Sequence, residues 1–133
     1  MQTLLVVDDD VAIVEVLAEI LEYAGYRVVR AHNGHAALTC LAQAPADLVL
    51  SDVMMPQLDG PALCRRIQAD PALRGIPVIL MTAARHTSAP DGCVPAAWLP
   101  KPFDINDVVA TVDRLLQVPP GSAAAAVAAP GRD

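Results

Sequence analysis

The chain has 133 residues, which is long enough for one compact domain with a substantial core but too short for two. It holds 9 lysines and arginines against 15 aspartates and glutamates, so its formal net charge is -6. Proteins bind nucleic acids through clustered cations, and this charge balance therefore argues against DNA or RNA as a direct partner. No apolar run reaches the roughly 20 residues that cross a bilayer, and the first residues lack the basic start of a signal peptide. We therefore expect a cytoplasmic protein that does not insert into membranes.

The chain contains three cysteines, Cys40, Cys64 and Cys93. Their number is odd, and they show neither a C-x-x-C pair nor the spacing of Cys/His metal ligands. We therefore expect buried or incidental free thiols, and neither a disulfide framework nor a zinc site.

Five short apolar runs of the strand type recur along the chain, at residues 4–7, 27–31, 47–51, 77–81 and 96–99. Helical patterns separate the first four runs and another follows the last, at residues 11–24, 34–43, 61–69 and 105–117. Because the strands are apolar on both sides and alternate with helices, we expect a parallel sheet covered by helices on both faces. The chain is thus predicted to be an α/β protein, a doubly wound (βα)5 three-layer sandwich.

The first predicted helix is amphipathic. Its apolar face has four residues at helical spacing, Ile13, Leu17, Ile20 and Ala24. Its other face carries three glutamates that we interpret as solvated, Glu15, Glu19 and Glu22. Asp10 and Asp104 stand where the first and last helices begin, and we expect both to act as N-caps.

The fourth βα unit is the least regular part of the pattern. Residues 83–95 contain Pro90, Gly92 and Pro95 and show little apolar periodicity, so we expect a short, irregular or missing fourth helix. Residues 118–133 are rich in alanine and proline and indicate a low-complexity tail or linker stub. The folded domain is therefore expected to occupy residues 1–117.

Polar residues stand where the predicted strands end. Asp8 and Asp9 follow the first strand, the third strand ends in Asp52 and the fourth in Thr82, and Lys101, the only lysine of the chain, follows the fifth. In open α/β sheets, ligands bind beyond the carboxyl ends of the strands, so we expect these side chains to converge. Crowded carboxylates raise one another's pKa unless a cation compensates, and oxygen ligands with room for water suit Mg²⁺ or Mn²⁺. The sequence therefore predicts a site for a divalent cation.

Asp52 at the centre of such a site could act as a metal ligand, a base or a nucleophile. Its neighbours favour a nucleophile that takes a phosphoryl group as an acyl phosphate. The metal, the Lys101 ammonium and the Thr82 hydroxyl would then stabilise the equatorial phosphoryl oxygens.

Four segments carry these residues together, Leu4–Asp10, Leu48–Gly60, Pro77–Ala83 and Trp98–Phe103. In this order and at this spacing they resemble the receiver domain of bacterial two-component response regulators. The likeness covers residues 3 to 117. It implies the CheY-like variant of the flavodoxin-like sheet, with strand order 2-1-3-4-5.

The resemblance also implies a role for each site residue. Asp52 would be the phosphoacceptor, Asp9 a direct Mg²⁺ ligand, Asp8 a ligand through water, and the backbone carbonyl of Met54 a third protein ligand. Lys101 and Thr82 would contact the phosphoryl group, and the Lys101–Pro102 peptide is commonly cis in the family. Trp98 occupies the position of the switch aromatic.

By this resemblance the chain is a signalling switch in a phosphorelay. A histidine kinase or histidine phosphotransfer protein would phosphorylate Asp52, and an unidentified protein would read the result. The chain would not be an enzyme beyond self-phosphorylation from small donors and slow loss of the phosphate. Met54 and Ala84 offer no polar side chain to orient attacking water, so we expect a long-lived phosphoprotein.

Two alternatives remain open at this point. One is a phosphate-independent interaction module of the receiver type, because the stretch from Thr82 to Lys101 is short for the family and rich in proline. The other is an aspartate-nucleophile phosphohydrolase. Such enzymes of the haloacid dehalogenase type need a second aspartate two residues after the nucleophile, and Met54 stands there.

Overall fold

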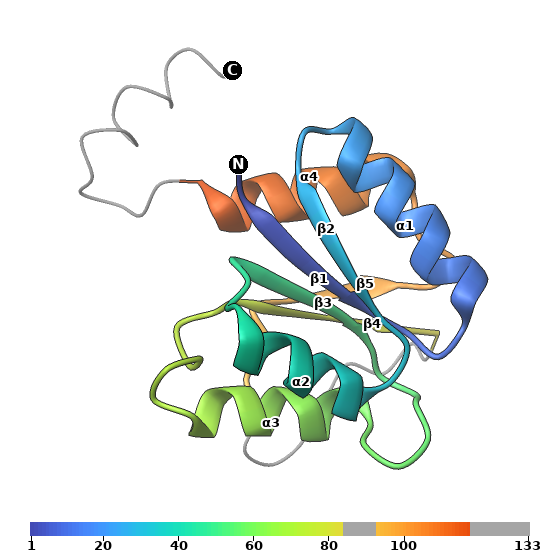
Figure 1. Ribbon diagram of the computed structural model, residues 1–133. Coiled ribbons are helices and arrows are strands. Elements are labelled where there is room, and N and C mark those ends of the chain that lie inside the picture. Colours follow the sequence, from blue (N-terminus) through green and yellow to red (C-terminus); the bar gives the residue numbers. More distant parts are fainter. Residues whose placement is uncertain (84–92, 118–133) are drawn as a thin grey trace.

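The computed structural model describes residues 1–83 and 93–117, which form a five-stranded parallel sheet between two layers of helices (Figure 1). The strands are β1 (Thr3–Val7), β2 (Arg27–Ala31), β3 (Leu48–Asp52), β4 (Val78–Thr82) and β5 (Ala97–Pro100). The helices are α1 (Val11–Tyr23), α2 (Gly34–Gln43), α3 (Gly60–Ala69) and α4 (Ile105–Leu116). The strand order is β2-β1-β3-β4-β5, and every neighbouring pair is parallel. The predicted order and fold class are therefore confirmed.

Each face of the sheet carries its own apolar layer. Helices α2 and α3 cover one face and helices α1 and α4 cover the other (Figure 1). Side chains alternate along each strand, so Leu5 and Val7 of β1 enter the α2/α3 layer while Leu4 and Val6 enter the α1/α4 layer. Strands apolar on both faces are what a doubly wound sheet requires.

The last three strands begin and end one residue later than predicted. Strand β3 begins at Leu48, because Asp47 lies at its entrance, where its N–H donates to the carbonyl of Thr3 and its carboxylate accepts from the Thr3 N–H. At the other end Asp52 remains in the sheet opposite Met81. Asp52 is therefore the last residue of β3, as predicted.

The predicted apolar face of α1 is partly wrong. The residues that α1 buries are Val14, Leu17, Ala18 and Leu21, whereas Ile13 and Ile20 are half-buried and Ala24 is exposed as the C-cap. Apolar residues occupy both stripes, so periodicity alone did not separate them. The three glutamates are exposed, as predicted, and two of them, Glu15 and Glu22, also bind Arg30 of β2 at 2.9 and 3.5 Å.

The helices begin at side-chain caps. Asp10 accepts from the N–H groups of Ala12 and Ile13, and Asp104 accepts from Asn106, as predicted for these two caps. Asn33 and Asp59 cap α2 and α3 in the same way. Helix α3 begins at Gly60, one residue before the predicted start.

Two predictions lie outside the described residues. The irregular fourth helix falls mainly on residues 84–92, and the low-complexity tail falls on residues 118–133. The helix predicted at 105–117 is the one labelled α4 in Figure 1. Within residues 1–83 and 93–117, no helix combines the length and the apolar character that crossing a membrane requires.

Candidate functional site

Three carboxylates meet at the carboxyl ends of two neighbouring strands. Strands β1 and β3 pair up to Val7 and Ser51, so the next residues, Asp8 and Asp52, lie side by side at this edge of the sheet. Each of Asp8, Asp9 and Asp52 places a carboxylate oxygen within 4.8 Å of the others. Asp8 and Asp52 are buried and Asp9 is exposed. The site therefore has a buried floor and one side open to solvent.

Asp8 is the most buried carboxylate of this group, with 1% of its surface exposed. Its Oδ1 accepts the backbone N–H of Asp10 at 2.9 Å, and its Oδ2 accepts from the Lys101 ammonium at 3.0 Å. Burial raises the pKa of Asp8, and these two hydrogen bonds only partly offset that effect while the charge of Asp52 adds to it. Any further cation that reaches the site would therefore stabilise the charged form of Asp8.

Lys101 joins the two buried carboxylates. Its Nζ lies 3.0 Å from Asp8 Oδ2 and 2.9 Å from Asp52 Oδ1. Burial alone would lower the pKa of Lys101, but the hydrogen bonds and charges of the two carboxylates outweigh it and raise the pKa. The ammonium is thus held in its charged form. The peptide between Lys101 and Pro102 is cis, as the resemblance implies.

Thr82 lies beside this group as the last residue of β4. Its side chain is buried, and its carbonyl accepts the backbone N–H of Lys101 at 2.9 Å. The ends of β4 and β5 are therefore joined next to the carboxylates, which places Thr82 and Lys101 together as predicted.

The two remaining predicted site residues are Met54 and Trp98. Met54, two residues after Asp52, is 76% exposed. Trp98 is half-buried, stands opposite Leu80 in the sheet and packs against the α2/α3 layer. It is the second residue of β5, and Pro100 ends the strand.

Two residues next to Asp52 were given no site role from the sequence. The hydroxyl of Ser51 donates to the Asp52 carbonyl at 2.9 Å. A Cβ atom on Gly60 would lie 2.3 Å from the same carbonyl oxygen, so the first turn of α3 packs directly on it. The motif quoted from the sequence contains both residues, but only their positions beside Asp52 reveal these contacts.

The donor set fits a hard divalent cation. Asp8, Asp9 and Asp52 offer carboxylate oxygens only, and the exposed side leaves room for water ligands. A carboxylate beside an ammonium and such a cation is also suited to attack a phosphoryl group, because charge on the transferred group would be neutralised from two sides.

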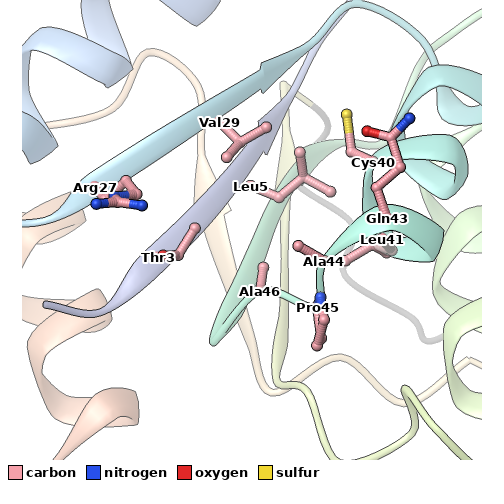
Figure 2. A pocket seen from close by; sticks show the side chains of 10 residues that line it. All are labelled: Thr3, Leu5, Arg27, Val29, Cys40, Leu41, Gln43, Ala44, Pro45 and Ala46. Carbon is pink, nitrogen blue, oxygen red and sulfur yellow. The ribbon is translucent and has the colours of Figure 1, made fainter.

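A cavity lies at the opposite end of the strands from the carboxylates. Its volume is about 220 Å³. It lies between the first residues of β1 and β2 and the last turn of α2 (Figure 2). Its lining residues are Thr3, Leu5, Arg27, Val29, Cys40, Leu41, Gln43, Ala44, Pro45 and Ala46. None of the predicted site residues is among them.

The family model of the response regulator receiver domain matches residues 4–113. This chain belongs to the response regulator receiver family. The receiver domain is 35% identical over 120 residues to the DNA-binding dual master transcriptional regulator RpaA of Synechocystis, covering 88% of this chain and 50% of RpaA. It is 37% identical over 117 residues to the response regulator MprA of Mycobacterium avium, covering 86% and 50%. The chain spans about half the length of these curated relatives.

Solved structures of response regulators are also similar to this chain. A putative response regulator from Chloroflexus aurantiacus superposes with a TM-score of 0.80 at 35% identity, covering 86% of this chain and 97% of that one. The response regulator TrrA from Thermotoga maritima, crystallised in complex with Mg(2+)-BeF, has a TM-score of 0.79 at 31% identity, covering 87% and 100%. Receiver domains of response regulators are phosphoacceptor signalling domains that interact with histidine kinases, and this receiver domain has their fold.

Proposed function

We propose that Asp52 is the phosphoacceptor of this receiver domain and that its phosphorylation depends on Mg²⁺. The observation that carries the proposal is the single ammonium of Lys101 between the buried carboxylates of Asp8 and Asp52, with Asp9 beside them. Asp8, Asp9, Asp52 and the backbone carbonyl of Met54 would hold the cation. Bound there, Mg²⁺ would neutralise charge on the transferred phosphoryl group.

The chemistry is a displacement at phosphorus. A carboxylate oxygen of Asp52 forms a bond to phosphorus while the bond between phosphorus and the leaving group breaks, and the leaving group departs with the bonding electrons. The Lys101 ammonium, 2.9 Å from Oδ1 of Asp52, is placed to contact an equatorial phosphoryl oxygen. The buried Thr82 would donate its hydroxyl to another. No group on this chain needs to act as a general base, because a carboxylate nucleophile has no proton to lose when it attacks phosphorus.

The phosphoryl donor is a histidine kinase or a histidine phosphotransfer protein, so the leaving group is an imidazole. Small acyl phosphates would also serve as donors, with slow loss of the phosphate afterwards. The support is the family membership, together with a structural neighbour crystallised with Mg(2+)-BeF. In this proposal residues 1–117 form the receiver domain and residues 118–133 a linker stub.

Phosphorylation would shift an equilibrium between two conformations. New negative charge at Asp52 attracts Lys101 and the Thr82 hydroxyl, and Trp98, two strand positions before Pro100, would repack in response. The surface that changes would then be read by a downstream protein. The two relatives described above are about twice as long as this chain, and RpaA is named as DNA-binding. The expectation that this chain itself contacts no nucleic acid stays a prediction.

The test is the intact mass of the protein after incubation with acetyl phosphate. We expect wild type to gain about 80 Da, the mass of one phosphoryl group, only when Mg²⁺ is present. Asp52→Asn should gain nothing, and Asp59→Asn, which changes the helix cap of α3, should behave as wild type. A folded wild-type chain that gains no mass with either acetyl phosphate or a phosphorylated histidine donor would instead support a phosphate-independent interaction module.

A further inference from the structure

Ser51 is a polar residue in an apolar layer. It is fully buried, and its partners across the sheet are Val7 of β1 and Leu80 of β4, which both belong to the α2/α3 layer. Alanine would fill nearly the same volume without burying a hydroxyl. The hydroxyl donates to the carbonyl of Asp52 at 2.9 Å. This hydrogen bond explains why a serine can stand in the apolar layer.

The carbonyl of Asp52 needs such a donor. Pairing between β1 and β3 ends at Val7 and Ser51, so Asp52 has no partner residue on β1. On its other side Gly60 closes the space, because even a Cβ atom there would lie 2.3 Å from the carbonyl oxygen. A buried carbonyl without a donor carries the full cost of its desolvation. Ser51 therefore supplies a donor at the point where β1 has ended.

The backbone after Ser51 is held by three consecutive hydrogen bonds. Ser51 fixes the carbonyl of Asp52, the N–H of Val53 donates to Met81 at 2.9 Å, and the carbonyl of Val53 accepts from Gly60 at 3.0 Å. Together these bonds orient both peptide groups between Asp52 and Met54. The side chain of Asp52 and the carbonyl of Met54 are the groups that the proposed function assigns to the cation and the phosphoryl group.

We propose that Ser51 is a positioning residue for Mg²⁺ binding and phosphorylation at Asp52, an inference that rests on the proposed function. Without its hydroxyl, the Asp52 carbonyl would turn toward another donor, and the peptide that carries Asp52 and leads to Met54 would turn with it. Displacements well below 1 Å matter at a metal or phosphoryl site, because ligand and attack geometry are both strict. Ser51 touches neither the cation nor the phosphoryl group and acts through the backbone of Asp52.

The test compares Ser51→Ala, Ser51→Thr and Thr39→Ala in the full chain. Thr39 is the matched control, because its hydroxyl also donates to a backbone carbonyl, that of His35 at 3.1 Å, but on the exposed side of α2. Affinity for Mg²⁺ alone is measured by calorimetry, and the initial rate with acetyl phosphate is measured by intact mass. Circular dichroism confirms that each variant is folded.

We expect Ser51→Ala to weaken Mg²⁺ binding and to slow phosphorylation by roughly tenfold each, the low end for residues that orient metal ligands. Ser51→Thr, which keeps the hydroxyl, should recover most of both, and Thr39→Ala should match wild type. If Ser51→Ala does not fold, Ser51→Cys keeps the volume with a much weaker donor and carries the same expectation. A folded Ser51→Ala or Ser51→Cys with wild-type Mg²⁺ affinity would overturn the inference. Failure of wild type itself to take a phosphoryl group would instead overturn the proposed function, while the Mg²⁺ affinities would still test Ser51.

Discussion

The ammonium of Lys101 lies 3.0 Å from Oδ2 of Asp8, a residue 93 positions earlier in the chain. The same ammonium lies 2.9 Å from Oδ1 of Asp52. One cation thus serves two buried carboxylates, and their negative charges are not fully compensated. Burial raises the pKa of Asp8, so this carboxyl group favours its protonated form or the arrival of a second cation. The pH and metal dependence of stability should report this imbalance.

Without divalent cations, the stability of the wild-type protein should fall as pH rises through the weakly acidic range. Burial raises the folded-state pKa of Asp8 above its ordinary value of 3.8, so the folded chain holds this proton more tightly than the unfolded chain. The contribution to stability is present below that ordinary value and is lost as pH rises through the raised pKa. Asp8→Asn should remove this dependence and be about 1 kcal/mol more stable than wild type at pH 7 in chelator.

Chemical denaturation between pH 4 and pH 7 measures both effects. Asp107→Asn on the exposed side of α4 removes one negative charge without touching the site and should keep the wild-type slope. Adding Mg²⁺ should raise the unfolding temperature of wild type and of Asp107→Asn but have little effect on Asp8→Asn. Equal slopes for Asp8→Asn and wild type would show that burial of Asp8 is not the cause.

Replacing Gly60 by alanine should destabilise the domain by about 1–3 kcal/mol. The new Cβ would meet the carbonyl oxygen of Asp52 at 2.3 Å, and neither atom can easily move, because the oxygen is part of the backbone and the backbone of residue 60 fixes the Cβ. Gly75 is the matched control, because a Cβ there would meet nothing within 4 Å. Gly75→Ala should change the free energy of unfolding by less than about 0.5 kcal/mol. Equal effects of the two substitutions in urea denaturation would contradict the packing described for α3.

The acyl phosphate on Asp52 should have a lifetime longer than seconds. Met54, two residues after Asp52, is 76% exposed and has no polar group to orient attacking water. The other residue invoked for this expectation, Ala84, lies outside the described part of the chain. Met54→Asn should shorten the lifetime roughly tenfold by supplying a group that binds water. The exposed Tyr23→Asn, at the end of α1, should not. The decay of the phosphorylated mass with time gives the lifetime, and loss within seconds in wild type would disprove the expectation.

The three cysteines should differ in reactivity. Burial, with a further contribution from the neighbouring Cys93, raises the pKa of Cys64 to about 12, whereas Cys40 is partly exposed. Iodoacetamide at pH 8 should therefore label Cys40 first and label Cys64 only after unfolding in urea. The folded thiol of Cys64 holds its proton more tightly than the unfolded one, so its contribution to stability is lost as pH rises above 9.0. Similar labelling rates for the three thiols in the native protein would contradict this assignment.

Much of the fold was predictable because its signals are local and repeated. Five apolar runs that alternate with helical patterns predict a parallel sheet, and residues at the carboxyl ends of such strands meet at one edge. This reasoning correctly brought together Asp8, Asp9 and Asp52 with Lys101, although long stretches of chain separate them. The start of β3 was not predictable, because Asp47 bonds to Thr3 at the entrance of the strand without being part of it.

Other features depend on packing that periodicity does not encode. Helix α1 has apolar residues on two adjacent stripes, and only contact with the sheet decides that Val14 is buried and Ile13 half-buried. The role of Ser51 depends on where β1 ends relative to β3, a register that no local pattern specifies. The pairing of Arg30 with Glu15 likewise joins a strand to a helix through tertiary geometry.

The most direct test of the central claim is to locate the phosphoryl group chemically. Borohydride reduces an aspartyl phosphate to homoserine, which tandem mass spectrometry assigns to one position. After incubation with acetyl phosphate and Mg²⁺, followed by borohydride, we predict homoserine at position 52 only, and none when Mg²⁺ is replaced by chelator. Homoserine at position 8 or 9, or equal labelling of position 52 with and without Mg²⁺, would contradict the account.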